Sequence, residues 1–171
     1  DVVAVGDDYY LTASSFNCIP GLPILHSKDL VNWELIGHAV TKLQPESEFD
    51  KPSHGNGVWA PCISYHNGEF YIYWGDPDYG VFMVKTKNPA GKWDDPVCVI
   101  PGKGMIDTSP LWDEDGRVYL VNGWANSRNR FASVITVREL NAEGTKAISD
   151  PVIVFDGNGT ENRTCEGPKF Y

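Results

Sequence analysis

The chain of 171 residues is long enough for one domain with a sizeable core, and 23 acidic against 14 basic residues give it a net charge of −9. No basic stripe is present, which argues against nucleic acid and anionic membranes as partners, and no apolar run approaches the roughly 20 residues of a membrane helix. The 6 Trp, 8 Tyr, 7 Phe, 17 Gly and 12 Pro favour short strands joined by tight turns.

Three segments of the chain repeat one layout, in which a strand opens with Gly. Turn-forming residues precede the second and third of these Gly, and this is the chemistry of a β-hairpin whose Gly has positive φ. The Gly-led strands cover residues 6–11, 68–73 and 116–121. Their spacings of 62 and 48 residues (68 − 6 and 116 − 68) are on the scale of β-propeller blades.

Each unit holds one apolar strand before the Gly-led strand and two short strands after it. In chain order the predicted strands are 2–5, 6–11, 22–26 and 33–36, then 61–65, 68–73, 81–84 and 93–97, then 109–112, 116–121, 133–137 and 149–155. Four strands in a simple meander, repeated along the chain, predict an all-β fold, a β-propeller of four-stranded antiparallel blades. A β-sandwich also offers many short strands, but the long repeat with matched internal landmarks favours the propeller.

The repeat divides residues 1–171 into blades, and together these blades make up one partial β-propeller domain. Blade one covers about 1–52, blade two about 53–100, blade three about 101–160, and the start of blade four about 161–171. Three blades leave open sheet edges and an unclosed ring. We therefore expect a piece of a larger propeller that is poorly folded and inactive alone.

The inner strand of each blade begins at one end of the propeller axis, so these starts converge on one funnel. The corresponding starts are 59–60, 106–107 and 165–166, which place Asp107, Glu166 and Trp59 in one axial pocket. Paired carboxylates in a cleft lined by aromatic side chains are typical of glycoside hydrolases, in which one carboxyl group protonates the leaving oxygen and another activates water or stabilises charge. Taken singly, Asp107 could cap a turn and Glu166 could be a solvated charge, but their equivalent placement on successive units favours a function.

Several segments, 5–10, 20–33, 58–61, 106–107 and 166–168, resemble glycoside hydrolase family 43, the five-bladed propeller β-xylosidases and α-L-arabinofuranosidases. The resemblance implies a catalytic domain that hydrolyses xylo-oligosaccharide or arabinoxylan by single-displacement inversion. It implies that Glu166 is the general acid and that Asp107 tunes and orients it. The family's base is the Asp of an Asp-Pro pair. Aligned on Gly6, Asp1 falls on the residue after that Pro, so the base lies two positions before Asp1.

Five further side chains are candidates for substrate binding: Trp59, Phe16, Trp74, Trp124 and His26. The three Trp and the Phe are expected near the funnel rim, where aromatic rings can pack on the C–H faces of a sugar. Core or loop packing explains them nearly as well. For His26 a structural hydrogen bond is the alternative to the rim role that the resemblance allows.

Two other functions stay open at this point. One is a non-catalytic carbohydrate-binding propeller, and the other is an invertase-like propeller that retains configuration through a nucleophile. The four cysteines lie far apart without a zinc spacing, and the resemblance implies no redox or organic cofactor, although an axial calcium ion in the full-length parent is compatible with it. Localisation stays open, with an extracellular or periplasmic parent favoured over a cytoplasmic one.

Overall fold

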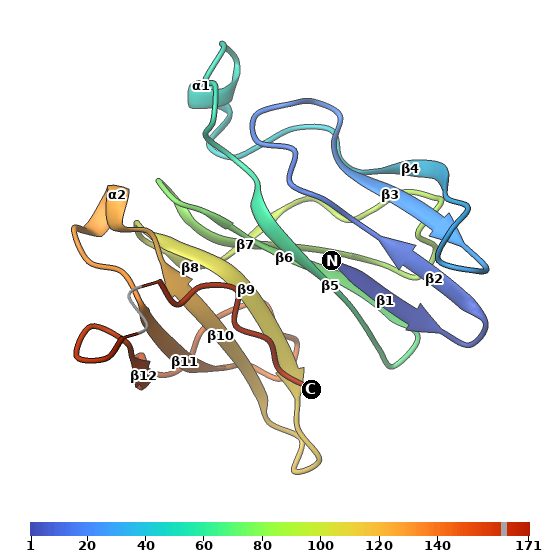
Figure 1. The fold of residues 1–171 in the computed structure, drawn as a ribbon. Helices are drawn as coiled ribbons and strands as arrows, with labels where there is room; N and C mark the ends of the chain where they lie inside the picture. Colours follow the sequence, from blue (N-terminus) through green and yellow to red (C-terminus); the bar gives the residue numbers. More distant parts are fainter. Residues whose placement is uncertain (162–163) are drawn as a thin grey trace.

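The computed structural model describes residues 1–161 and 164–171 of the chain. Within these residues, twelve strands form three four-stranded antiparallel sheets, as the repeat predicts (Figure 1). Blade one is β1 Val2–Val5, β2 Asp8–Leu11, β3 Gly21–Ser27 and β4 Glu34–Val40. Blade two is β5 Trp59–His66, β6 Glu69–Asp76, β7 Gly80–Thr86 and β8 Val97–Pro101. Blade three is β9 Met105–Trp112, β10 Val118–Trp124, β11 Val134–Leu140 and β12 Val152–Asp156.

The first strands of the three blades, β1, β5 and β9, are neighbours in space (Figure 1). Two short helices, α1 Glu46–Phe49 and α2 Asn126–Asn129, lie at the end of the molecule where β5 and β9 begin (Figure 1). The hairpin turns that follow β1, β5 and β9 lie at the opposite end. Gly6, Gly68 and Gly116 in these turns have φ of 60°, 82° and 83°, as the hairpin chemistry predicts.

Strand β6 is buried on both faces because its side chains alternate between two cores. Phe70, Ile72 and Trp74 belong to the cluster between blades one and two. Tyr71 and Tyr73 belong to the cluster between blades two and three. Successive side chains of a strand point to opposite faces, so one strand supplies both interfaces. Blade two is therefore held between its two neighbours.

The last strands of blades one and two begin later than the sequence predicted. Trp93 does not open a strand, because its ring is buried in the core and its Nε1 donates a hydrogen bond of 3.2 Å to the carbonyl oxygen of Pro89. The ring thus anchors the turn, and β8 begins only at Val97. In blade one the indole Nε1 of Trp33 likewise bonds the carbonyl oxygen of Leu30, at 3.1 Å, and β4 begins one residue later.

The predicted start of blade four contains no strand among its described residues, and residues 162–163 of that segment lie outside the described part. Residues 164–171 instead run as an irregular segment tied to blade three. The amide of Cys165 donates to Ser133 Oγ at 3.3 Å, and the amide of Phe170 donates to Ser109 Oγ at 3.3 Å. The bond to Ser109 holds the segment beside the inner strand β9, and the bond to Ser133 ties it to the residue before β11.

A buried hydrogen bond joins blade two to the β11–β12 connection, and it generates a stability prediction. The Tyr73 hydroxyl donates to the carbonyl oxygen of Gly144 at 2.8 Å, and a Cβ added at Gly144 would collide with that hydroxyl. Gly144 (φ 69°) and Gly116 (φ 83°) both have left-handed backbone, but Gly116 has open space around it. We expect Gly116→Ala to cost about 1–2 kcal/mol of backbone strain and Gly144→Ala to cost at least about 1 kcal/mol more, from overpacking.

The measurement is urea unfolding of both variants in the full-length protein. Since the two substitutions share the backbone strain, the difference between them isolates the collision with Tyr73. Equal losses of unfolding free energy would contradict the interblade role of this bond.

Candidate active site

The inner strands β5 and β9 begin with the same irregularity. In β5 two residues, Ala60 and Pro61, stand opposite the single residue Trp74, and in β9 Asp107 and Thr108 stand opposite Asn122. Ala60 and Asp107 both have left-handed backbone, with φ of 34° and 56°. A β-bulge re-aims the side chain of its extra residue, and such bulges are common beside active sites.

The bulge in β9 brings Asp107 to the segment that carries Glu166. Asp107 Oδ2 accepts a hydrogen bond of 2.8 Å from the amide of Gly167, the residue after Glu166. Both carboxylates line a hollow of about 720 Å³, together with Asp1 and Lys169. The structure thus brings together the two carboxylates that the sequence singled out.

Asp1 occupies a different position in its strand from Asp107. Its amino group and carbonyl pair with Thr12 at 2.8 and 3.1 Å, so Asp1 stands opposite Thr12 as Cys62 stands opposite Tyr73. Asp1 directly precedes β1 and lies four residues before its last residue, Val5, just as Cys62 lies four residues before the last residue of β5, His66. By this register Asp1 is equivalent to Cys62, which lies two residues after the bulge residue Ala60.

The Asp1 carboxylate is bound on two sides. Its Oδ2 accepts a hydrogen bond of 3.2 Å from the amide of Ile63 and forms an ion pair of 3.0 Å with Lys169 Nζ. These contacts join blade one to β5 and to the segment that carries Glu166. Lys169 places a positive charge in a hollow whose other charged side chains are those of Asp1, Asp107 and Glu166.

Trp59 and Phe16 lie in a second hollow of about 550 Å³, which shares Asp107 and Glu166 with the first. Phe16 is 44% exposed, and its backbone exchanges hydrogen bonds of 3.1 and 3.0 Å with Val58, so the loop that carries it is pinned beside β5. The Nε1 of Trp59 donates to the carbonyl oxygen of Gly55 at 2.7 Å. Two of the four aromatic side chains that the sequence placed near the funnel thus line one hollow with the two carboxylates.

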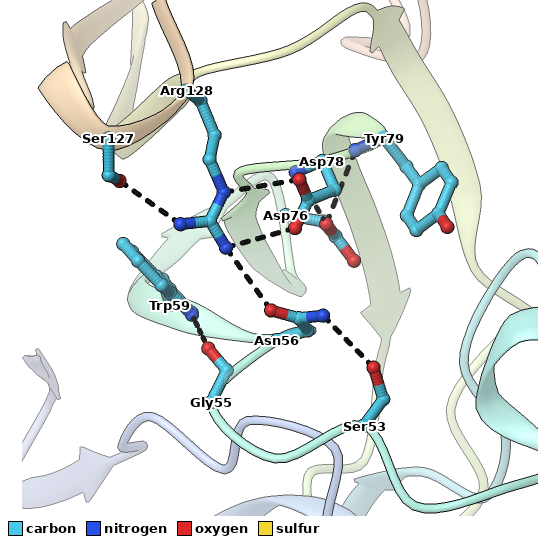
Figure 2. Close-up of polar contacts among 9 residues, drawn as sticks. All are labelled: Ser53, Gly55, Asn56, Trp59, Asp76, Asp78, Tyr79, Ser127 and Arg128. Atoms are coloured by element: carbon cyan, nitrogen blue, oxygen red, sulfur yellow. Dashed lines mark hydrogen bonds and ion pairs between the residues drawn. The ribbon is translucent and has the colours of Figure 1, made fainter.

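Figure 2 shows the polar network behind Trp59. Arg128 of α2 donates two hydrogen bonds to the Asp78 carboxylate, of 3.1 and 3.0 Å, and one of 3.1 Å to Asn56 Oδ1. The Arg128 guanidinium also lies 5.3 Å from the centre of the Trp59 ring. A further bond of 3.1 Å to Ser127 Oγ stays within α2.

Three of the substrate-binding candidates lie away from these hollows. Trp74 is only 2% exposed and stacks on Phe82 at 5.8 Å, because the alternation of β6 turns it into the core between blades one and two. His26 lies near the hairpin end of blade one, where its Nε2 bonds the Asp8 carboxylate. The structure thus places Trp74 in the core instead of at the rim, and gives His26 the local hydrogen bond that was the alternative to its rim role.

Trp124 ends β10 next to the cleft but packs inward. Its Nε1 donates to Thr136 Oγ1 at 3.0 Å, and its ring lies 5.3 Å from that of Phe131. The residues that follow it, 125–127, line the second hollow in its place. Their position directly after the third Gly-led strand was a signal that could have identified them.

Two features of the site carried weaker signals in the sequence. Lys169 follows Glu166 by three residues, and that proximity could have marked it as a cleft residue. Arg128 lies in a four-residue helix, and its partners Asp78 and Asn56 are 50 and 72 residues away, so no local pattern connects them.

Among the described residues, no cluster of three or more His, Cys, Asp or Glu side chains could hold a metal ion. No helix in the described ranges is long and apolar enough to cross a membrane.

A buried carboxylate supports the turn that presents Asp78. Asp76 is 2% exposed, and its Oδ1 accepts hydrogen bonds from the amides of Asp78 and Tyr79 at 2.9 and 3.3 Å. Burial raises the pKa of Asp76 from 3.8 to about 6, because removal from water disfavours the charged form. The two amide bonds and the nearby Arg128 oppose this rise in pKa only in part.

This raised pKa predicts how stability depends on pH. Below about pH 4 both the folded and the unfolded chain hold the Asp76 proton, but between pH 4 and 6 only the folded state keeps it. The contribution of Asp76 to stability is therefore lost as the pH rises through this window. We expect Asp76→Asn, which keeps the acceptor oxygen, to be more stable than the parent by about 1–3 kcal/mol at pH 7, and to match it below pH 4.

The measurement is urea unfolding of the full-length protein at several pH values from 4 to 7. Asp95→Asn, at an exposed carboxylate, is the matched control and should keep the pH dependence of the parent. An Asp76→Asn variant with the same pH dependence as the parent would contradict this role of Asp76.

Comparison with known proteins gives one consistent family. The profile described as Glycosyl hydrolases family 43 matches residues 1–171. A Beta-xylosidase from Formosa agariphila is 32% identical over 171 residues, covering 94% of this chain and 29% of that protein. The Non-reducing end alpha-L-arabinofuranosidase BoGH43B from Bacteroides ovatus is 43% identical over 125 residues, covering 71% of this chain and 23% of that protein.

Solved structures agree with the fold. The crystal structure of xylan beta-1,4-xylosidase from Bacillus Halodurans C-125 superposes with a TM-score of 0.79 at 30% identity, covering 100% of this chain and 34% of that one. The Bacteroides ovatus Xyloglucan PUL GH43B structure superposes with a TM-score of 0.72 at 34% identity, covering 90% of this chain and 30% of that one. The chain thus spans less than a third of the length of the two curated relatives described above.

Proposed function

The chain belongs to glycosyl hydrolase family 43, and from this membership we propose that the protein of which it forms part is a glycoside hydrolase acting on xylan-derived oligosaccharides. Relatives named as a β-xylosidase and an α-L-arabinofuranosidase support substrates of xylose and arabinose. The observation that carries the proposal is the pairing of Asp107 with the Glu166 segment in one cleft lined by aromatic rings.

The proposed reaction is a single displacement that inverts configuration at the anomeric carbon. Glu166 donates its proton to the leaving oxygen as the glycosidic bond breaks, while a carboxylate base takes a proton from the attacking water. Two carboxylates on opposite sides of the bond are required for this mechanism. In this chain Glu166 supplies the acid, and its carboxyl group lines both hollows of the cleft.

We assign Asp107 the task of tuning and orienting Glu166. A negative charge favours the protonated form of a carboxyl group nearby, which is the form that an acid catalyst needs. The hydrogen bond from the Gly167 amide to Asp107 Oδ2 supports this assignment, because it fixes the backbone next to Glu166. Left-handed backbone at Asp107 keeps its side chain at the bulge.

We assign the base to the residue two positions before Asp1 in the whole protein. That position is equivalent by strand register to Ala60, the bulge residue of β5, which itself lines both hollows. Asp1 is engaged by the Ile63 amide and by Lys169, which suits a neighbour of the base that holds the strand in place.

The first test removes the proton donor. In the full-length protein, Glu166→Gln keeps the size of the side chain but cannot donate the proton, and we expect kcat on xylobiose to fall by about 10²–10⁴-fold. An aryl xyloside with a good leaving group should lose less, because its leaving oxygen needs less protonation. Glu161→Gln, at an exposed carboxylate of the same segment, is the matched control. Unchanged turnover of xylobiose by Glu166→Gln would overturn the assignment of Glu166 as the acid, whereas binding without turnover in the parent would favour a non-catalytic carbohydrate-binding propeller.

The second test concerns the stereochemistry of the product. Single displacement predicts that the first sugar released has the opposite anomeric configuration to the substrate. Proton NMR of the reaction, recorded before mutarotation proceeds, identifies that anomer. Retention of configuration would point to a covalent intermediate and would overturn the assignment of an acid–base pair.

A further inference from the structure

Arg128 connects three segments that are distant in the sequence. It belongs to α2 after blade three, and its bidentate partner Asp78 belongs to the turn between β6 and β7 of blade two. Its partner Asn56 precedes β5, and the Asn56 amide group donates in turn to Ser53 Oγ at 3.0 Å. A guanidinium is planar and carries five donors, so it can hold several loops at fixed angles where an ammonium could not.

The same guanidinium lies against the Trp59 ring, 5.3 Å from its centre. Trp59 is held at its other end by the bond from Nε1 to the Gly55 carbonyl oxygen (Figure 2). The ring therefore has two fixed supports, and its remaining surface contributes to the hollow that holds Asp107 and Glu166. Arg128 and Asp78 are both largely shielded, with side chains 23% and 22% exposed, which strengthens their pairing compared with a surface ion pair.

Arg128 also fixes a second wall of this hollow. Arg128 is itself a residue of α2, and the residues just before it, Asn126 and Ser127, line the same hollow as Trp59. One side chain thus sets where β5 and α2 stand relative to each other at the mouth of the cleft. None of its bonds reaches Asp107 or Glu166.

We propose that Arg128 is a positioning residue that holds Trp59 and the α2 segment as the two sides of the sugar-binding cleft, so that sugar affinity depends on Arg128 through Trp59. The role rests on the proposed function, because it presumes that the cleft binds a sugar. It extends that function by assigning a determinant of affinity that lies outside the acid–base groups. Removal of such a group should weaken binding and leave the chemical step nearly intact.

The decisive measurement is xylobiose binding by calorimetry in the full-length protein carrying Glu166→Gln, so that the sugar is not consumed. We expect Arg128→Met to raise Kd about tenfold, and Arg128→Lys to raise it about threefold, because Lys keeps the charge but loses the paired bonds to Asp78. In a Trp59→Leu background the same Arg128→Met change should alter Kd by less than twofold, since the ring through which it acts is gone.

Arg117→Met is the matched control. Arg117 likewise pairs with a carboxylate, that of Asp115, and lies 5.5 Å from the centre of an aromatic ring, that of Tyr119, but it is at the hairpin end of blade three. Its replacement should leave Kd unchanged. In the active protein, Arg128→Met should raise KM by about tenfold with kcat and the pH–rate profile within twofold of the parent.

The outcomes separate the two proposals. A parent protein that binds no xylobiose would overturn the proposed function and the role of Arg128 with it. Normal binding by the parent together with an unchanged Kd in Arg128→Met would overturn the role of Arg128 alone. An equal loss of affinity with and without Trp59 would also overturn it, because Arg128 would then act on the cleft by another route. If Arg128→Met fails to fold, the milder Arg128→Lys variant carries the same comparison.

Discussion

The two-sided burial of β6 is the constraint on which the arrangement of this molecule depends. A strand that buries both faces must have a sheet packed against each of them, and here these are the sheets of blades one and three. Once blade two is held in this way, its first strand β5 has β1 and β9 as neighbours. The inner strands can then bring their starting residues to a common place, and a site can be built from three different blades.

The bulges turn this packing into a site. Without the extra residue at Asp107, the alternation of β9 would be regular from Ile106 onward, and the carboxylate would follow the sheet instead of meeting the Gly167 amide. The same bulge at Ala60 carries no functional group, so the repeat offers a geometric position at each blade and the sequence decides which positions become polar. Equivalent positions in successive blades can therefore hold different side chains, Ala60 in β5 and Asp107 in β9.

The sequence was sufficient to predict the fold and to predict that Asp107 and Glu166 line one cleft, because both predictions follow from periodic signals. The Gly in each inner hairpin turn and the recurring four-strand layout are local patterns. The sequence predicted that Asp107 and Glu166 take the same place in successive units, although the segment that carries Glu166 forms no strand among the described residues. The aromatic side chains were harder to assign because an aromatic residue satisfies a core and a sugar platform equally well. Trp74 lies in β6 opposite the bulge of β5 and packs in the core, whereas Trp59 begins β5 just before that bulge and lines the cleft. Arg128 was not visible at all, since its partners come from other blades and no spacing along the chain relates them.

The chain of support behind Trp59 begins at a residue with no access to the cleft. Asp76 is buried, and its carboxylate accepts hydrogen bonds from the amides of Asp78 and Tyr79. These bonds shape the turn that directs the Asp78 carboxylate toward Arg128. Burial of a carboxylate is costly unless hydrogen bonds compensate, so a buried Asp at this turn is better explained by the geometry that it imposes than by the stability that it adds. A Ser or Asn side chain could accept hydrogen bonds from the same amides. The Asp76 carboxylate in addition interacts electrostatically with the Arg128 guanidinium. The orientation of a ring at the surface of the cleft is thus determined in the interior of blade two, through Asp76, Asp78 and Arg128 in succession.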